Sequence, residues 1–203
     1  MDKKHMNLIV ISSPNQLKAE LEAVTLLFEA GMQTFHLRKP NLTSAEIAKY
    51  IKLIPEEYTN RVVVHKYSKL ANRFNIKGIH GANLQRIPGK TLSCSCHSFA
   101  ETEINKMKFD YMFLGPIYDS ISKENYKSKF SIYDLENALI AGVLTKQIYA
   151  LGGISVDKID ELKLLGVKGI AVLGALWKNF EHDKNIDKLI KNFIEIKEKC
   201  NEE

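Results

Sequence analysis

The sequence lacks any apolar run near the roughly 20 residues that a membrane-spanning helix needs. The chain begins Met1-Asp2-Lys3-Lys4-His5 and continues into a strand-like run, without the hydrophobic segment of a signal peptide. It also lacks a basic arm, because the net charge is only +5 and the lysines are spread along all 203 residues. These absences predict a cytoplasmic protein with neither a membrane nor a nucleic-acid partner.

Cysteine is scarce, with three residues in the chain. Cys94 and Cys96 are two apart and share one face of a strand, and His97 follows them. No second ligand pair follows at the spacing of a zinc site, so we interpret both as small apolar residues of a strand. Cys200 lies in a polar tail, where we expect a surface position.

The sequence does contain a regular alternation of strand-like and helix-like segments. Apolar residues with helical spacing occupy 16–30 and stop at Gly31, and Thr43 with Glu46 forms a capping-box pattern before the next helix. Gly81, Pro88 and Gly89 predict a loop in place of one helix. The strand-like runs are 8–12, 34–39, 61–66, 78–80, 91–97, 111–116, 148–151 and 169–173.

Such an alternation predicts a parallel sheet, and eight strands favour a single (β/α)8 barrel. No linker or change of composition divides residues 1–203, so we expect one barrel domain. An open doubly wound sheet is the alternative, but no G-x-G-x-x-G follows the first strand.

Two late strands end in glycine and open into helices, which predicts a phosphate site. Glycine lets the backbone approach an anion, and the free N–H groups of a helix start point at it. In a (β/α)8 barrel such a site usually lies after strands seven and eight. The expected phosphate contacts are therefore Gly152, Gly153, Leu173 and Gly174.

Other strand ends carry basic and titratable side chains. Arg38 offers a planar fork for carboxylate or phosphate. Four of the six histidines fall at strand ends, and imidazole titrates near neutral pH. We expect His97 to be an acid/base beside Ser95, and two or three of the other histidines to be bonded within the barrel rim. The polar segment 117–131, which holds Lys123, is expected to be a long loop able to close over the site.

Seven motifs, in order along nearly the whole chain, resemble the thiamine phosphate synthase and thiazole tautomerase (TenI-like) family. They are His36-Leu37-Arg38, Ser95-Cys96-His97-Ser98, Asp110-Tyr111, Gly115-Pro116-Ile117-Tyr118, Ser120-Ile121-Ser122-Lys123, Leu151-Gly152-Gly153-Ile154 and the run 166–172. The resemblance implies a barrel that holds a thiazole phosphate on backbone around Gly153, Leu173 and Gly174. It also implies that Lys123 reaches an anion, and it suggests a homo-oligomer.

The chain departs from the synthase pattern at the diphosphate and metal positions. In synthases strand two reads Gln-x-Arg-x-Lys, whereas this chain has His36 and, at the lysine position, Pro40. The Asn-Asp pair after strand three is His65-Lys66, and Gln85 lies where a second aspartate is expected. Because magnesium needs carboxylate oxygens, we predict no metal or cofactor, with Lys66 neutralising an anion itself.

Thiazole tautomerases resemble the chain more closely, because they keep His-x-Arg and Ser-x-His and lack the metal carboxylates. The favoured prediction is therefore a metal-independent proton shift on a thiazole phosphate. The alternatives are a magnesium-dependent thiamine phosphate synthase, which joins an aminopyrimidine diphosphate to a thiazole phosphate, and a non-catalytic protein that binds thiazole or thiamine phosphate. The predicted catalytic residues are His97, Arg38 and Lys66, and the predicted substrate contacts are His36, His65, Ser95, Lys123, Gly152, Gly153, Leu173 and Gly174.

Overall fold

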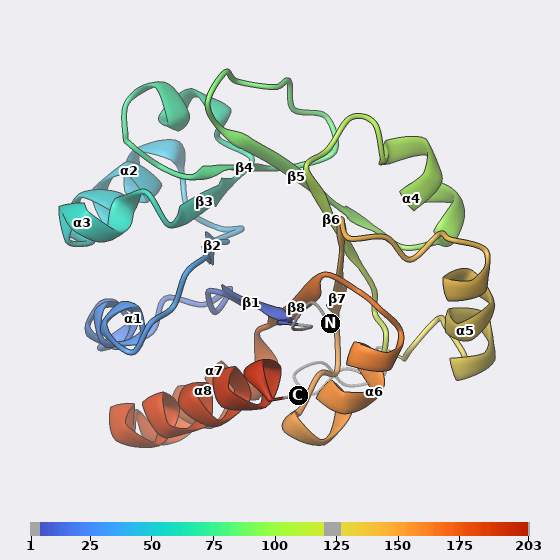
Figure 1. The fold of residues 1–203 in the computed structure, drawn as a ribbon. Helices are drawn as coiled ribbons and strands as arrows, with labels where there is room; N and C mark the ends of the chain where they lie inside the picture. The colour runs from blue at the N-terminus through green and yellow to red at the C-terminus, as the bar shows by residue number, and fades with distance from the viewer. Residues whose placement is uncertain (1–4, 120–126, 203) are drawn as a thin grey trace.

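The computed structural model of the protein describes residues 5–119 and 127–202. Eight parallel strands follow one another around a closed barrel, and the last pairs with the first (Figure 1). This arrangement confirms the predicted (β/α)8 barrel. The strands are β1 (Asn7–Ile11), β2 (Phe35–Leu37), β3 (Val62–His65), β4 (Gly78–His80), β5 (Thr91–Cys96), β6 (Tyr111–Leu114), β7 (Ile148–Leu151) and β8 (Gly169–Val172).

Helices surround the barrel, but the connections after β3 and β4 contain no α-helix. A 3-10 turn follows β3, and no helix follows β4 before β5, as the glycines and proline of that segment predicted. The helices are α1 (Glu20–Glu29), α2 (Ser44–Leu53), α3 (Glu56–Thr59), α4 (Phe99–Asn105), α5 (Ile132–Ile140), α6 (Ile159–Leu164), α7 (Gly174–Asp183) and α8 (Ile186–Asn201), with 3-10 turns η1 (Ser68–Asn72) and η2 (Val156–Lys158).

After β8 the chain forms two helices, where the sequence indicated one. Lys184 takes a left-handed conformation at φ 51° and ends α7. The Asn185 side chain then accepts a hydrogen bond from the Lys188 N–H and starts α8. Because of this break, β8 is followed directly by the start of a separate helix, α7, where the sequence predicted a phosphate site.

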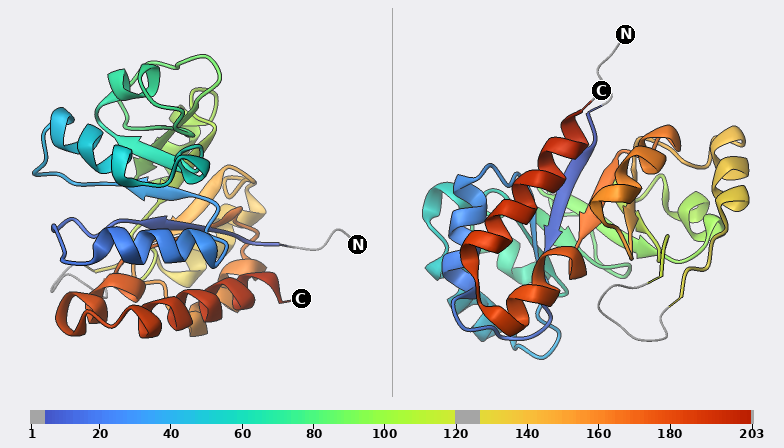
Figure 2. Two further views of the ribbon diagram at one scale, coloured as in Figure 1. Left: turned by 90° about the vertical axis from the view of Figure 1, so that its left-hand side faces the viewer. Right: turned by 90° about the horizontal axis from the view of Figure 1, so that it is seen from below.

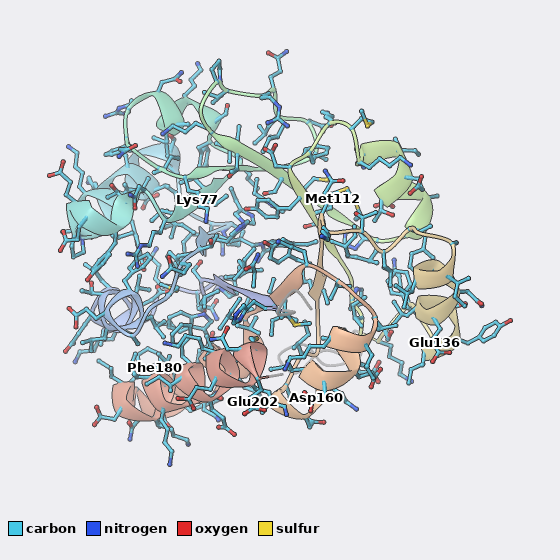
Figure 3. All side chains as sticks on the ribbon, in the orientation of Figure 1. Lys77, Met112, Glu136, Asp160, Phe180 and Glu202 are labelled. Atoms are coloured by element: carbon cyan, nitrogen blue, oxygen red, sulfur yellow. The ribbon has the colours of Figure 1, made fainter. Side chains whose placement is uncertain are left out.

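The barrel has an inner and an outer apolar layer. The inner cluster fills the barrel, while the outer one lies between strands and helices, with charged side chains such as Glu136 pointing outward (Figure 3). Close packing of both layers fixes the strand ends on which the site depends. The inner cluster consists of Ile9, Ile11, Tyr111, Phe113, Tyr149 and Ala171.

Helix α8 lies beside α1 along the outside of the barrel (Figure 2). The expected surface position of Cys200 is wrong, since its side chain is 1% exposed. Leu189, Phe193, Ile196 and Cys200 are spaced four, three and four residues apart, so the cysteine completes the buried stripe of the helix. The Cys200 carbonyl also accepts a hydrogen bond from the Met6 N–H at 3.2 Å.

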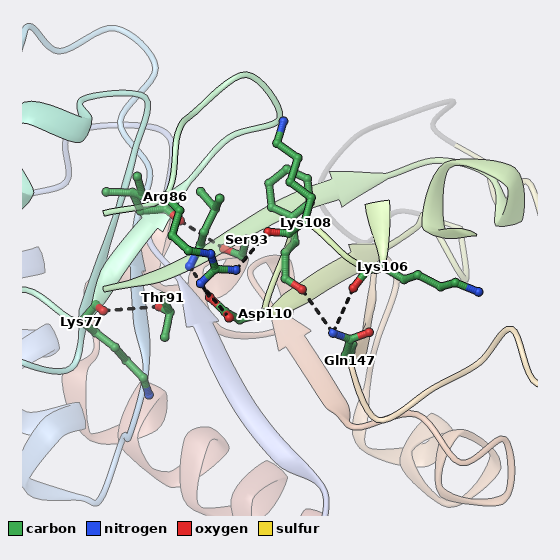
Figure 4. Close-up of polar contacts among 11 residues, drawn as sticks. Lys77, Arg86, Thr91, Ser93, Lys106, Lys108, Asp110 and Gln147 are labelled. Carbon is green, nitrogen blue, oxygen red and sulfur yellow. Dashed lines mark hydrogen bonds and ion pairs between the residues drawn. The ribbon is translucent and has the colours of Figure 1, made fainter. Parts of the chain in front are cut away.

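Polar contacts tie together the amino-terminal ends of β5, β6 and β7 (Figure 4). Asp110 accepts hydrogen bonds from Arg86 at 2.9 Å and from the Leu92 N–H at 2.7 Å. The Gln147 amide donates to the carbonyls of Lys106 and Phe109. This end of a (β/α)8 barrel serves stability, and chemistry is expected at the other end.

Among the described residues, no helix combines the length and the apolar character that crossing a membrane requires.

Candidate active site

A cavity of about 580 Å³ opens at the carboxyl ends of the strands. This is the end at which barrel enzymes place their chemistry. Residues from the ends of β2, β3, β4, β5, β7 and β8 line it, together with apolar side chains of the barrel interior. The predicted site residues among its lining are Arg38, His65, Lys66, Ser95, His97, Gly152, Gly153, Leu173 and Gly174.

One part of the lining, the glycine corner, consists of Gly152 and Gly153 after β7 and of residues 173–175 at the start of α7. Gly152 and Gly153 take φ values of 98° and 66°, which L side chains rarely adopt. A Cβ on Gly153 would lie 2.2 Å from the Asp119 carbonyl oxygen, so no side chain fits at position 153. The first N–H groups of α7 lack acceptors within their helix, and they can bind an anion in the cavity.

A second part, the basic corner, consists of Arg38 and Lys66. The Ser12 hydroxyl bonds both the Arg38 N–H (2.9 Å) and the Arg38 carbonyl (3.0 Å), which fixes the backbone below the guanidinium. Lys66 is exposed and has φ 69°, although it is not glycine. Such backbone strain is concentrated at functional sites, and here it sets the direction of a lysine at the cavity rim.

Lys39 also lines the cavity, but its ammonium is held by protein groups. Its Nζ lies 2.5 Å from Glu20 Oε2 and 2.5 Å from the Asn15 carbonyl oxygen, and both charged side chains are buried. Burial lowers the pKa of Lys39 and raises that of Glu20, while the attraction between the two opposes both shifts. The pair fixes the loop after β2, and it leaves Arg38 and Lys66 as the cations of the basic corner.

Three histidines from adjacent strands meet at the floor of the cavity: His36, His65 and His80. His36 Nδ1 lies 3.0 Å from His65 Nε2, and His36 Nε2 lies 2.7 Å from the Tyr111 hydroxyl. The His65 and His80 rings stack with centroids 4.3 Å apart. We call these three residues the histidine cluster.

Hydroxyl groups hold His80 of the histidine cluster in place, and burial sets the protonation state of all three rings. His80 Nδ1 lies 2.8 Å from Ser93 Oγ, and its Nε2 lies 3.1 Å from Ser95 Oγ. Burial lowers the pKa of His36 and of His65 well below the ordinary value, and each is lowered further by its histidine neighbours. Burial and then Arg38 lower the pKa of His80 to about 3. All three rings are therefore neutral at pH 7, the form that can accept a bond or bind a metal.

His97 lies at the edge of the cavity, apart from the cluster. Its Nδ1 lies 2.9 Å from the Gly115 carbonyl oxygen, which can only accept, so Nδ1 carries the proton in this contact. Its backbone N–H donates to the Glu101 carboxylate at 2.8 Å. The side chain is largely exposed, and its Nε2 is the nitrogen left for a ligand.

Two of the predicted site residues are not among the described lining of the cavity, for different reasons. His36 is completely buried and does not line the cavity, because its nitrogens already contact His65 and Tyr111. Lys123 lies outside the described residues, as does the central part of the 117–131 loop.

Sequence reasoning left His80 and Tyr111 out of the predicted site. His80 lines the cavity and contacts Ser95, and Tyr111 supports the site through its contact with His36. His65 and His80 are the last residues of β3 and β4, whereas His36 is the middle residue of β2. That the three rings converge depends on the register, in which His65 pairs with His80, and short strands do not reveal their register.

Residues 7–176 match the family model described as thiamine monophosphate synthase. A solved structure of thiamine phosphate pyrophosphorylase from Bacteroides thetaiotaomicron is 35% identical, with a TM-score of 0.84, over 96% of this chain and 97% of that one. Thiamine-phosphate synthase from Clostridium tetani is 31% identical over 79% of this chain and 80% of its own length. The Lactococcus lactis subsp. cremoris thiamine-phosphate synthase is 25% identical over 96% of this chain and 98% of its own.

These comparisons contradict the favoured prediction of a thiazole tautomerase. The similar proteins are named as synthases or as a pyrophosphorylase, and the alternative of a synthase is better supported. The prediction was wrong because it used the missing carboxylates to choose the reaction. The absence of metal-binding carboxylates indicates that positive charge is supplied by other groups. It does not identify which bond the enzyme makes.

Proposed function

Because the chain belongs to the thiamine monophosphate synthase family of thiamine-pathway enzymes, we propose that it joins an aminopyrimidine diphosphate to a thiazole phosphate. The thiazole nitrogen forms a bond to the exocyclic carbon of the pyrimidine. The bond from that carbon to the diphosphate oxygen breaks, and diphosphate leaves with the electron pair. The likeness to a pyrophosphorylase structure over almost the full length of both chains carries this proposal.

The cavity supports the proposal because it has separate places for two anions. The glycine corner offers backbone N–H groups, which suit the phosphate of the thiazole substrate. The basic corner offers the fork of Arg38 and the ammonium of Lys66, which suit the diphosphate. Charge on the leaving diphosphate grows as its bond breaks, so cations fixed there stabilise the transition state more than the substrate.

We assign His65, Ser95 and His97 to the space between the two corners, where they are available to hydrogen-bond the rings of the substrates. His36 would act from below by holding His65 through their 3.0 Å contact. Phe113 closes the floor and stacks on His80, with ring centroids 4.9 Å apart. Apolar side chains such as Ile11 and Phe113 lie beside a few polar groups in the lining, which is typical of a pocket for a flat ring.

Magnesium, which the synthase reading implies, does not fit these residues. Among the described residues that line the cavity, Glu181 is the one acid, and its Oε1 accepts a hydrogen bond from Ser13 at 2.7 Å. Magnesium is bound through carboxylates, and the groups here are imidazoles, an ammonium and a guanidinium. We therefore assign no step to magnesium, and Arg38 and Lys66 supply the positive charge.

Turnover tests this function. Purified protein incubated with the aminopyrimidine diphosphate and the thiazole phosphate should form thiamine phosphate and diphosphate in equal amounts. Protein freed of magnesium and assayed with a chelator should react within a few-fold of the rate measured with magnesium added, because the described lining holds no pair of carboxylates for the ion. Absence of product under both conditions would refute the synthase assignment, and tight binding of thiazole phosphate without turnover would favour the non-catalytic alternative.

The partners in this proposal are the small-molecule substrates. A cytoplasmic location, a homo-oligomeric state and the treatment of residues 1–203 as one domain stay predictions from the sequence.

A further inference from the structure

The histidine cluster has a property that the synthase reaction does not require. One nitrogen from each of His36, His65 and His80 lies within 4.8 Å of the others. The rings come from three neighbouring strands, so the barrel itself fixes their spacing. Histidines that only stabilise a rim need one partner each, whereas each of these three brings a nitrogen to one small region, and His65 and His80 also line the open cavity.

We propose that His36, His65 and His80 form a binding site for a borderline divalent transition metal such as Zn²⁺. Zinc bonds to imidazole nitrogen of about 2.0–2.1 Å place two ligand atoms of a tetrahedral site roughly 3.3 Å apart. His36 Nδ1 and His65 Nε2 are 3.0 Å apart, close to that separation, and the His80 nitrogen, within 4.8 Å of the other ligand atoms, has to move closer. Three imidazoles with one open position form a recurring arrangement for zinc.

The groups around the cluster can orient its rings as outer ligands. Tyr111 lies 2.7 Å from His36 Nε2, so His36 can donate there while Nδ1 binds the ion. Ser93 and Ser95 each hold one nitrogen of His80, and one of these two bonds has to be given up. Such outer contacts fix the tautomer and aim the lone pair of a metal-binding histidine.

Charge determines which metals the site accepts. The ligands are neutral, and Arg38 and Lys66 lie on the same side of the barrel, so a divalent ion meets repulsion and gains no carboxylate. This excludes magnesium, which needs oxygen ligands, and favours ions that bond strongly to imidazole. His65 and His80 line the cavity, so an anionic ligand could reach the fourth position from there and offset the positive charge.

Cobalt is the probe, because tetrahedral Co²⁺ absorbs visible light. Titrating the full chain with Co²⁺, without substrate, should produce a visible absorption band that saturates at one ion per chain. His65→Gln and His80→Gln should each weaken binding by about 100-fold or more, and Tyr111→Phe by about 10-fold. His182→Gln is the matched control, because His182 is an exposed residue of α7, and it should bind as the parent does.

Thermal melting of each variant shows that it is folded before its binding is interpreted. Absence of a saturable band in the parent, or equal binding by the folded His65→Gln variant, would overturn the proposal and leave the cluster as a hydrogen-bonded network. The inference does not rest on the proposed synthase reaction, since the titration contains no substrate. Failure of either one therefore leaves the other standing.

Discussion

Replacing Arg38 with alanine should lower kcat/KM for thiamine phosphate formation by about 100- to 1,000-fold, the usual cost of removing a fixed group that stabilises transition-state charge. The effect should be large because the basic corner carries the charge that a metal would otherwise supply, and Lys39 is held by Glu20. Most of the loss should appear in kcat, since the guanidinium meets more charge as diphosphate leaves.

Arg38→Lys is the conservative variant in this experiment, and Arg86→Ala is the control. The lysine variant keeps the charge and loses the fork, so its rate should lie between those of the parent and the alanine variant. Arg86 pairs with Asp110 at 2.9 Å at the opposite end of the barrel, and its loss should change kcat/KM by less than about twofold. An Arg38→Ala enzyme within threefold of the parent would remove Arg38 from the reaction.

Acidification should destabilise the protein through the histidine cluster. In the unfolded chain histidine titrates near 6.5, while in the folded protein burial lowers the pKa of His80 to about 3. Below pH 6.5 the unfolded state therefore binds more protons, and the free energy of unfolding falls as the pH falls. Lowering the pH from 6.5 to 4 should cost about 3 kcal/mol through His80 alone, at about 1.4 kcal/mol per pH unit.

Urea denaturation of metal-free protein across this pH range measures the effect. His80→Asn should show a smaller loss of stability on acidification than the parent, because its side chain does not titrate. Leu189→Ala is the control, since a cavity in the outer core lowers the free energy of unfolding by a similar amount at every pH. Parallel pH profiles for the parent and His80→Asn would show that His80 is not held neutral by burial.

The parts of the site that are made of backbone could be predicted from the sequence. Glycines after two apolar runs are a local pattern, and Gly152 and Gly153 do take the positive φ values that require glycine. The barrel could also be predicted from the sequence, because the alternation of strands and helices repeats along the whole chain. The loop after β4 followed from Gly81, Pro88 and Gly89 for the same local reason.

Features that depend on contacts between distant residues could not be predicted. The pairing of Lys39 with Glu20 and the meeting of His36 with Tyr111 join residues that no spacing connects. The burial of Cys200 could have been predicted, because Cys200 continues the helical spacing of Leu189, Phe193 and Ile196, but the prediction relied on the polar residues around it. The reaction itself was assigned wrongly, since residues that are missing constrain chemistry less than residues that are present.

A crystal structure of the protein with thiamine phosphate and diphosphate would test most directly whether one cavity holds two anions in separate corners. We predict the phosphate of thiamine phosphate on the backbone N–H groups of Gly153 and of Gly174 at the start of α7, with the diphosphate on Arg38 and Lys66. Both anions bound away from these groups, or a diphosphate held by carboxylate-bound magnesium, would contradict the account.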